Sequence, residues 1–171
     1  MHNMMRKGEY YIGDPCYIFP SGDEGHEEWL SFLDALPTIE LPIEYRDTKL
    51  PNGVIVREPF FPEWVIEFKP FEWKGQTVLV QRTAYGDGIY SVYSRGSNIG
   101  EACVDAGLIA AVPWALVEMY AEQNGPKYED LIPRLAVQHT FEEDFKCSYE
   151  EGLFRFGDVS IMTGDEDEEE S

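Results

Sequence analysis

The chain of 171 residues has 33 aspartates and glutamates but only 13 lysines and arginines, so its formal net charge at pH 7 is −20. Nucleic acids and anionic membranes are polyanions, and proteins bind them through clustered lysine and arginine. The composition therefore excludes both as targets of the bulk surface. Basic protein surfaces, cations and sites that normally receive DNA or RNA remain as binding partners.

The length and a hydrophobic content of 43% suit one folded domain with one core. The longest apolar run, residues 108–117, is too short to span a membrane, and residues 1–7 lack the apolar stretch of a secretory signal. Cys16, Cys103 and Cys147 are widely spaced and odd in number, which predicts free thiols rather than a disulfide framework. We expect a soluble cytoplasmic protein.

In chain order, the first predicted elements are two short extended segments, residues 10–12 and 16–19, on either side of a Gly-Asp-Pro corner. A helix is predicted over residues 27–36, because its apolar residues fall at helical spacing and acidic residues suit its amino-terminal end. Five prolines then break residues 37–62 into loops, with one short strand at residues 54–57.

β-Branched and aromatic residues predict three strands in the middle of the chain, which we expect to form a meander: residues 64–68, 77–82 and 89–93. Val104 and residues 108–112 extend this sheet. Pro113 then opens a second helix that runs to residue 123 and ends at an Asn-Gly-Pro sequence.

Four strands are predicted at the carboxyl end, with a hairpin turn at residues 150–152: residues 135–141, 145–149, 153–156 and 159–162. The whole pattern predicts a single α+β domain over residues 1–163. Its sheet is expected to be twisted and mainly antiparallel, with two helices.

Residues 164–171 have no apolar side chain to pack, and their charge predicts a disordered tail. Two interpretations of this tail remain open: it keeps the protein soluble, or it mimics a phosphate backbone and binds a basic partner. An EF-hand is not supported, because the turn glycine and the distal glutamate are missing. The candidate partner-binding residues of the tail are Asp165, Glu166, Asp167, Glu168, Glu169 and Glu170.

Six large aromatic residues crowd residues 60–73. They either face the core, as the alternation in residues 64–68 suggests, or form an exposed anchor patch for a protein partner. The candidate partner-binding residues of this stretch are Phe60, Phe61, Trp64 and Trp73.

Nucleophilic catalysis, a zinc site and a phosphate-binding loop receive little support from the sequence. Cys16 and His139 could in principle form a nucleophilic pair, but no nucleophile signature surrounds Cys16, and a small buried thiol is the simpler interpretation. The dispersed histidines and cysteines lack the spacing of a zinc site. Residues 86–88 precede a strand, whereas a phosphate-binding glycine loop precedes a helix.

Three short segments stand out: residues 13–17 (GDPCY), 83–90 (TAYGDGIY) and 104–109 (VDAGLI). In this order they resemble a family of small, largely uncharacterised bacteriophage and bacterial proteins that carry GDPCY, YGDG and VDxG segments. The resemblance implies a compact, β-rich fold and a phage or bacterial origin. It implies no catalytic residues, and the acidic tail is not part of the pattern.

The aspartates of these segments, Asp14, Asp87 and Asp105, allow two interpretations. If they converge, their oxygens could hold a divalent metal ion that activates water for hydrolysis of a phosphate ester. Alternatively, each carboxylate accepts hydrogen bonds from nearby backbone in a glycine- or proline-containing turn.

These observations favour a non-enzymatic acidic binding protein without a cofactor. We expect a phage-type inhibitor that occupies a basic, nucleic-acid-binding surface of a host or partner protein. A metal-dependent hydrolase built on the three aspartates is one alternative. An immunity protein or structural interaction protein whose acidity only keeps it soluble is another.

Overall fold

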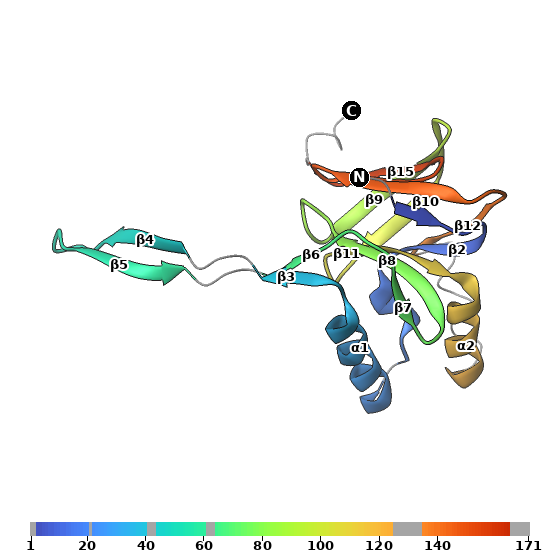
Figure 1. Cartoon of the computed structure of the whole chain (residues 1–171), viewed down its shortest axis with the longest axis horizontal. Coiled ribbons are helices and arrows are strands. Elements are labelled where there is room, and N and C mark those ends of the chain that lie inside the picture. Colours follow the sequence, from blue (N-terminus) through green and yellow to red (C-terminus); the bar gives the residue numbers. More distant parts are fainter. Residues whose placement is uncertain (1–2, 21, 41–43, 61–63, 125–134, 165–171) are drawn as a thin grey trace.

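Two stacked antiparallel sheets with helices on one side form the body of the protein, and a β-hairpin projects from it (Figure 1). This computed structural model describes residues 3–20, 22–40, 44–60, 64–124 and 135–164. The body therefore has three layers: a six-stranded sheet, a five-stranded sheet and a helical layer.

The five-stranded sheet is the middle layer, and both of its faces are buried. Along β2, Tyr10 and Ile12 face the other sheet, whereas Tyr11 between them faces the helices. Strands buried on both faces read as continuous apolar runs. The strands, in spatial order, are β12 (Val137–Phe141), β2 (Gly8–Gly13), β11 (Leu108–Pro113), β8 (Gln76–Arg82) and β7 (Phe71–Trp73).

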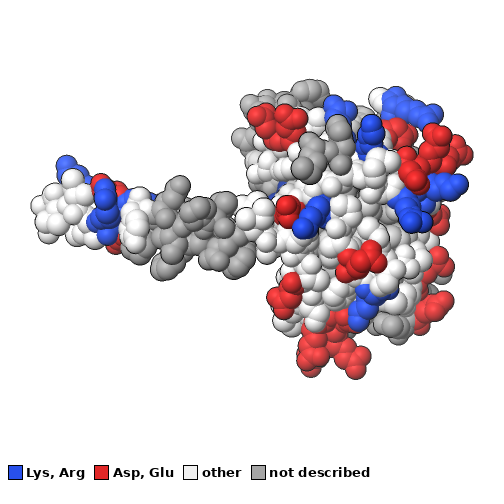
Figure 2. Space-filling model, viewed as in Figure 1, with Lys and Arg blue, Asp and Glu red and all other residues white. Residues whose placement is uncertain are grey.

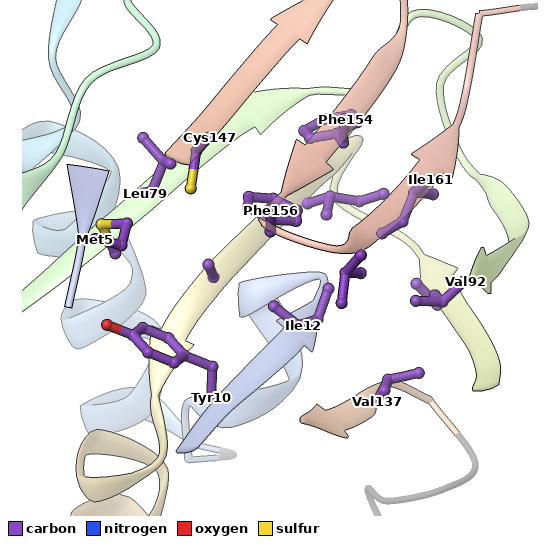
Figure 3. Packing of buried hydrophobic residues seen from close by; sticks show 14 of the residues in the cluster. Met5, Tyr10, Ile12, Leu79, Val92, Val137, Cys147, Phe154, Phe156 and Ile161 are labelled. Atoms are coloured by element: carbon purple, nitrogen blue, oxygen red, sulfur yellow. The ribbon is translucent and has the colours of Figure 1, made fainter. Parts of the chain in front are cut away.

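The six-stranded sheet buries one face only. Its inward side chains, among them Phe154, Phe156 and Ile161, pack against Ile12 and Leu79 of the middle layer (Figure 3). The strands, in spatial order, are β1 (Asn3–Met5), β13 (Phe145–Glu150), β14 (Leu153–Phe156), β15 (Val159–Met162), β9 (Gly88–Ser94) and β10 (Ser97–Val104).

A second core lies between the middle sheet and the helical layer, which consists of the 3₁₀ helix η1 (Pro15–Ile18), α1 (Asp23–Ala35) and α2 (Trp114–Asn124). Phe32 of α1 is fully buried and lies edge-on to Trp73, with 5.4 Å between the ring centroids. The Trp73 indole N–H donates to the Tyr120 hydroxyl over 3.1 Å, which ties β7 to α2.

The projecting hairpin, called the ribbon below, consists of two antiparallel pairs. Near the body, β3 (Thr38–Glu40) pairs with β6 (Trp64–Ile66); farther out, β4 (Glu44–Lys49) pairs with β5 (Ile55–Phe60). The register is the same in both pairs, because paired residue numbers always sum to 104, as in Thr38 with Ile66 and Lys49 with Ile55. The turn is closed by a backbone hydrogen bond from Leu50 to Val54.

The predicted α+β class is confirmed, since every pairing between described strands is antiparallel and two α-helices cover the sheet. The strands divide into two stacked sheets and the ribbon. The three cysteines are free thiols, as predicted. No helix in the described part of the chain is both long and apolar enough to cross a bilayer.

The predicted meander of the middle strands is wrong. β6 pairs with β3, β8 lies between β11 and β7 in the middle sheet, and β9 lies between β15 and β10 in the other sheet. Alternation within a strand shows that it has a buried face, but it does not show which other strand it pairs with.

The loops predicted within residues 37–62 are wrong where β3 and β4 lie, whereas the short strand predicted at residues 54–57 overlaps β5. Pro51 lies in the turn. Pro59 lies in a two-stranded pair, and a proline is tolerated there because the N–H groups along the two outer edges bind no further strand. Residues 16–19 were expected to be extended, but residues 15–18 form η1, because Asp14 caps it and Pro15 suits its first position.

Gly25 is predicted to be required for the packing of α1. A Cβ at this position would lie 1.6 Å from the carbonyl oxygen of Pro20, so the Gly25→Ala variant must shift the helix. We expect it to lower the free energy of unfolding by about 1–3 kcal/mol, although alanine favours helix by about 1 kcal/mol. Gly88→Ala is the control, because its Cβ would meet nothing closer than 3.6 Å. Equal melting temperatures of the two variants would contradict the prediction.

Candidate functional site

A buried carboxylate joins the first and third sequence motifs. Asp14 is fully buried. Its Oδ1 accepts a hydrogen bond from the Cys16 backbone N–H over 2.9 Å, and its Oδ2 accepts from the N–H groups of Asp105 and Ala106 over 2.8 Å and 2.7 Å. The Tyr11 hydroxyl donates to the Asp14 carbonyl over 2.7 Å. Asp14 therefore fixes a loop that lies about ninety residues away in sequence.

Burial and hydrogen bonding have opposite effects on the charged form of Asp14. Burial raises the pKa of this carboxyl, while the three backbone N–H groups lower it; burial has the larger effect, so the pKa lies above its ordinary value of 3.8. The hydrogen bonds thus offset only part of the desolvation. The carboxylate stabilises the fold by accepting hydrogen bonds from three backbone N–H groups at one point.

The second motif is held by two threonines. The Thr83 hydroxyl donates to the Gly86 carbonyl over 2.6 Å, and the Thr83 N–H donates to the Gly107 carbonyl over 3.0 Å. Thr163, which follows β15, accepts from the Ala84 N–H at its hydroxyl and donates its own hydroxyl to the Gly152 carbonyl. The second motif is thereby attached to the third motif and to the end of the six-stranded sheet.

The three motif aspartates lie in adjacent loops but have different surroundings. Asp14 is buried, whereas Asp87 and Asp105 are exposed. A Cβ on Gly107 would lie 3.8 Å from Oδ1 of Asp87, which places the second loop beside the third. Within the described part of the chain, no group of three His, Cys, Asp or Glu side chains is arranged to hold a metal ion. The hydrogen bonds of Asp14 support the interpretation of a structural turn.

Cys16 and His139 lie in different surroundings. Burial raises the pKa of the Cys16 thiol, and the neighbouring Asp14 raises it further, which disfavours the thiolate that nucleophilic chemistry needs. His139 lies beside Phe141, and its Nε2 is 3.6 Å from Oδ1 of Asp158. Cys16 is a free, half-buried thiol whose surroundings do not favour nucleophilic chemistry.

The second and third motifs form one wall of an apolar groove. Its volume is about 840 Å³, within the range of about 300–1,000 Å³ that small-molecule sites occupy. Residues of α1 also line it, as do Thr38 of β3 and Ile66 of β6 at the root of the ribbon. Asp34 contributes one negative charge to the groove lining, and Arg82 contributes one positive charge. The remaining lining residues are Trp29, Leu33, Leu36, Thr38, Ile66, residues 83–86 and residues 106–108.

The structure places the aromatic candidates in two regions. Trp73 belongs to the second core, as do Phe71 and Phe32 around it. Phe60 and Trp64 lie in the ribbon strands β5 and β6. Phe61 and the tail residues 165–170 lie outside the described residues.

The groove was not predicted from the sequence. Leu33 and Trp29 appeared only as part of a helix, and Arg82 only as the end of a strand. The segment around Tyr85 was recognised as a motif, but nothing in its sequence indicates which other residues line the groove. The hypothesis that the aspartates of the three motifs converge was the one signal that pointed to this region.

Comparison with protein-family models, with curated proteins and with solved structures finds no match to this chain. The resemblance to the phage and bacterial family therefore stays a prediction. The fold and the groove define the chain as a two-sheet α+β protein with a projecting ribbon.

Asp14 is predicted to be structural, and a pair of matched substitutions tests this. The Asp14→Asn variant keeps one acceptor oxygen and turns an amide toward at least one of the three N–H groups that the carboxylate binds. We expect a loss of about 1–3 kcal/mol in the free energy of unfolding. Asp87→Asn is the same chemical change at an exposed site and should cost less than about 0.5 kcal/mol. Denaturant unfolding of both variants measures the difference, and similar losses would refute the assignment.

The turn interpretation also predicts how the protein responds to metal ions. Millimolar magnesium, manganese or calcium should raise the melting temperature of the wild type and of Asp87→Asn equally, because only diffuse binding to the acidic surface occurs. A ligand that binds the native state at one site stabilises it by mass action. A large stabilisation that Asp87→Asn abolishes would establish the metal site instead.

Proposed function

We propose that this chain is a non-enzymatic binding protein that covers a basic surface of another protein and excludes nucleic acid from it. The observation that carries the proposal is the separation of charge within the molecule. The outer part of the ribbon, residues 44–60, has three acidic and three basic residues, so the net charge of −20 belongs to the rest of the chain.

Part of this charge is concentrated in α1. The helix has five acidic residues and no lysine or arginine, and Asp23, Glu24 and Glu27 are exposed at its beginning. Figure 2 shows acidic side chains gathered at this end of the body. Acidic residues at the amino-terminal end of a helix also stabilise it through the helix dipole, so this patch costs the fold little.

A second exposed acidic patch lies in the turn between β12 and β13, where Glu142, Glu143 and Asp144 follow one another. Asp144 accepts a hydrogen bond from the Lys7 backbone N–H over 2.9 Å, which holds the turn against the start of β2. The acidic residues 165–170 of the tail add six further charges.

Exposed carboxylates on a folded surface present a basic site with negative charge, as a phosphate backbone does. Opposite charges steer the encounter and raise the rate of association, and like charges keep wrong partners away. A phage or bacterial inhibitor of a nucleic-acid-binding protein, acting in the cytoplasm of a bacterium or of an infected host cell, fits this charge and the motif resemblance.

The proposal predicts fast, salt-sensitive binding. The immobilised protein should capture basic nucleic-acid-binding proteins from a bacterial lysate, and duplex DNA should compete with them. The dissociation constant of a captured protein should rise more than tenfold between about 50 and 300 mM salt, because screening weakens interactions between exposed charges. A flat salt profile, or no competition by DNA, would contradict it.

Three charge-reduced forms locate the surface: Asp23→Asn with Glu24→Gln and Glu27→Gln, Glu142→Gln with Glu143→Gln, and a chain truncated after Gly164. Each should weaken binding if its patch is used. The ribbon pair Asp47→Asn with Glu58→Gln removes the same charge as the turn pair and is the control. If the ribbon pair weakens binding as much, net charge alone accounts for the effect.

A further inference from the structure

The outer ribbon exposes apolar side chains that nothing in the described chain covers. Tyr45 and Ile55 are each 63% exposed, and Val54 is 50% exposed at the turn. Isolated two-stranded hairpins are marginally stable in water, because they bury little apolar surface. Arg57 and Asp47 form a cross-strand ion pair over 3.1 Å, but both side chains are exposed, and exposed ion pairs stabilise a fold little. A hairpin of this kind gains stability when its exposed apolar side chains are buried against a partner.

The groove has the complementary property: it is apolar, it is open, and it carries one charge of each sign. It also lies at the root of the ribbon, since Thr38 of β3 and Ile66 of β6 line it. We propose that two copies of this chain exchange ribbons. The outer part of each ribbon, residues 44–60, which is called the tip below, lies in the groove of the other copy. This assembly does not depend on the function proposed above.

The position of the groove makes this arrangement closed and symmetric. When two ribbons lie antiparallel about a two-fold axis, the tip of each reaches the root of the other, where the groove lies. Both contacts then form at once and no tip or groove is left over, as expected of a cyclic dimer.

Charge favours this meeting point over a contact between the two bodies. Two bodies that each carry most of a −20 charge repel when they touch, whereas the outer ribbon and the groove lining are each neutral in net charge. The described tip is six residues long on each strand, which is about 20 Å. Ribbons of this length keep the bodies apart by more than the Debye length of about 8 Å at physiological salt.

The area required by a specific interface points the same way. One face of the outer ribbon, about 20 Å by 10 Å, offers roughly 200 Å², so two ribbons laid face to face bury much less than the roughly 1,000 Å² of a specific interface. A ribbon that enters a groove buries its edges as well as a face. The exchange makes that contact twice.

Sedimentation of the purified full chain tests the proposal. Between about 1 and 200 µM, the wild type should pass from a monomer of 19.6 kDa to a dimer of twice that mass. The tip variant, Tyr45→Asp with Ile55→Asp, should raise the dimer dissociation constant more than tenfold. The groove variant Ala106→Arg, which fills the groove from an exposed position, should do the same.

The control variant is Met4→Asp with Ile89→Asp, which makes the same change at side chains that are 53% and 59% exposed on the outer face of the six-stranded sheet. It should dimerise like the wild type. An equimolar mixture of the tip and groove variants should dimerise more strongly than either alone, because one intact tip then meets one intact groove.

Each competing outcome overturns the exchange. A wild type that stays monomeric at 200 µM removes the dimer. A dimer that survives both the tip and the groove variants uses another surface, and a mixture that gains nothing shows that tip and groove do not contact each other.

Discussion

The arrangement of this protein depends on one buried carboxylate. Asp14 holds the N–H groups of Cys16, Asp105 and Ala106, and so joins the start of η1 to the loop between β10 and β11. β11 continues from that loop into the centre of the middle sheet, and the same loop lines the groove. A residue with an apolar side chain at position 14 would leave three N–H groups without this acceptor, at a cost that most single substitutions do not reach.

The middle sheet is the layer on which the others assemble. Because β2, β8 and β11 bury both faces, the six-stranded sheet and the helices each find an apolar surface ready to cover. Ala110 and Ala111 of β11 are fully buried and belong to different cores, which shows how small side chains let two layers approach one strand. The groove is lined by residues of the helical layer and of the motif loops.

The body and the outer ribbon of this molecule differ in net charge. The excess of acidic residues lies outside the outer ribbon, with five acidic residues in α1, whereas the outer ribbon is neutral and exposes Tyr45 and Ile55. The first property suits fast association with a basic surface, and the second suits a contact whose strength comes from burial. The two proposed contacts, of the acidic body with a basic partner and of the ribbon with a second copy of the chain, therefore do not oppose each other through like charges.

The sequence alone determined the α+β class, both helices, the free cysteines and most strands of the body, because periodicity and turn residues are local properties. Glu151-Gly152, for example, adopts positive φ at both residues, as its hairpin turn requires. Only the tertiary structure decided which sheet each strand joins, that Asp14 reaches Asp105, and that residues 38–66 contain a ribbon despite their prolines. Those outcomes depend on contacts between residues far apart in the chain, and a single sequence carries no signal of which distant groups will meet.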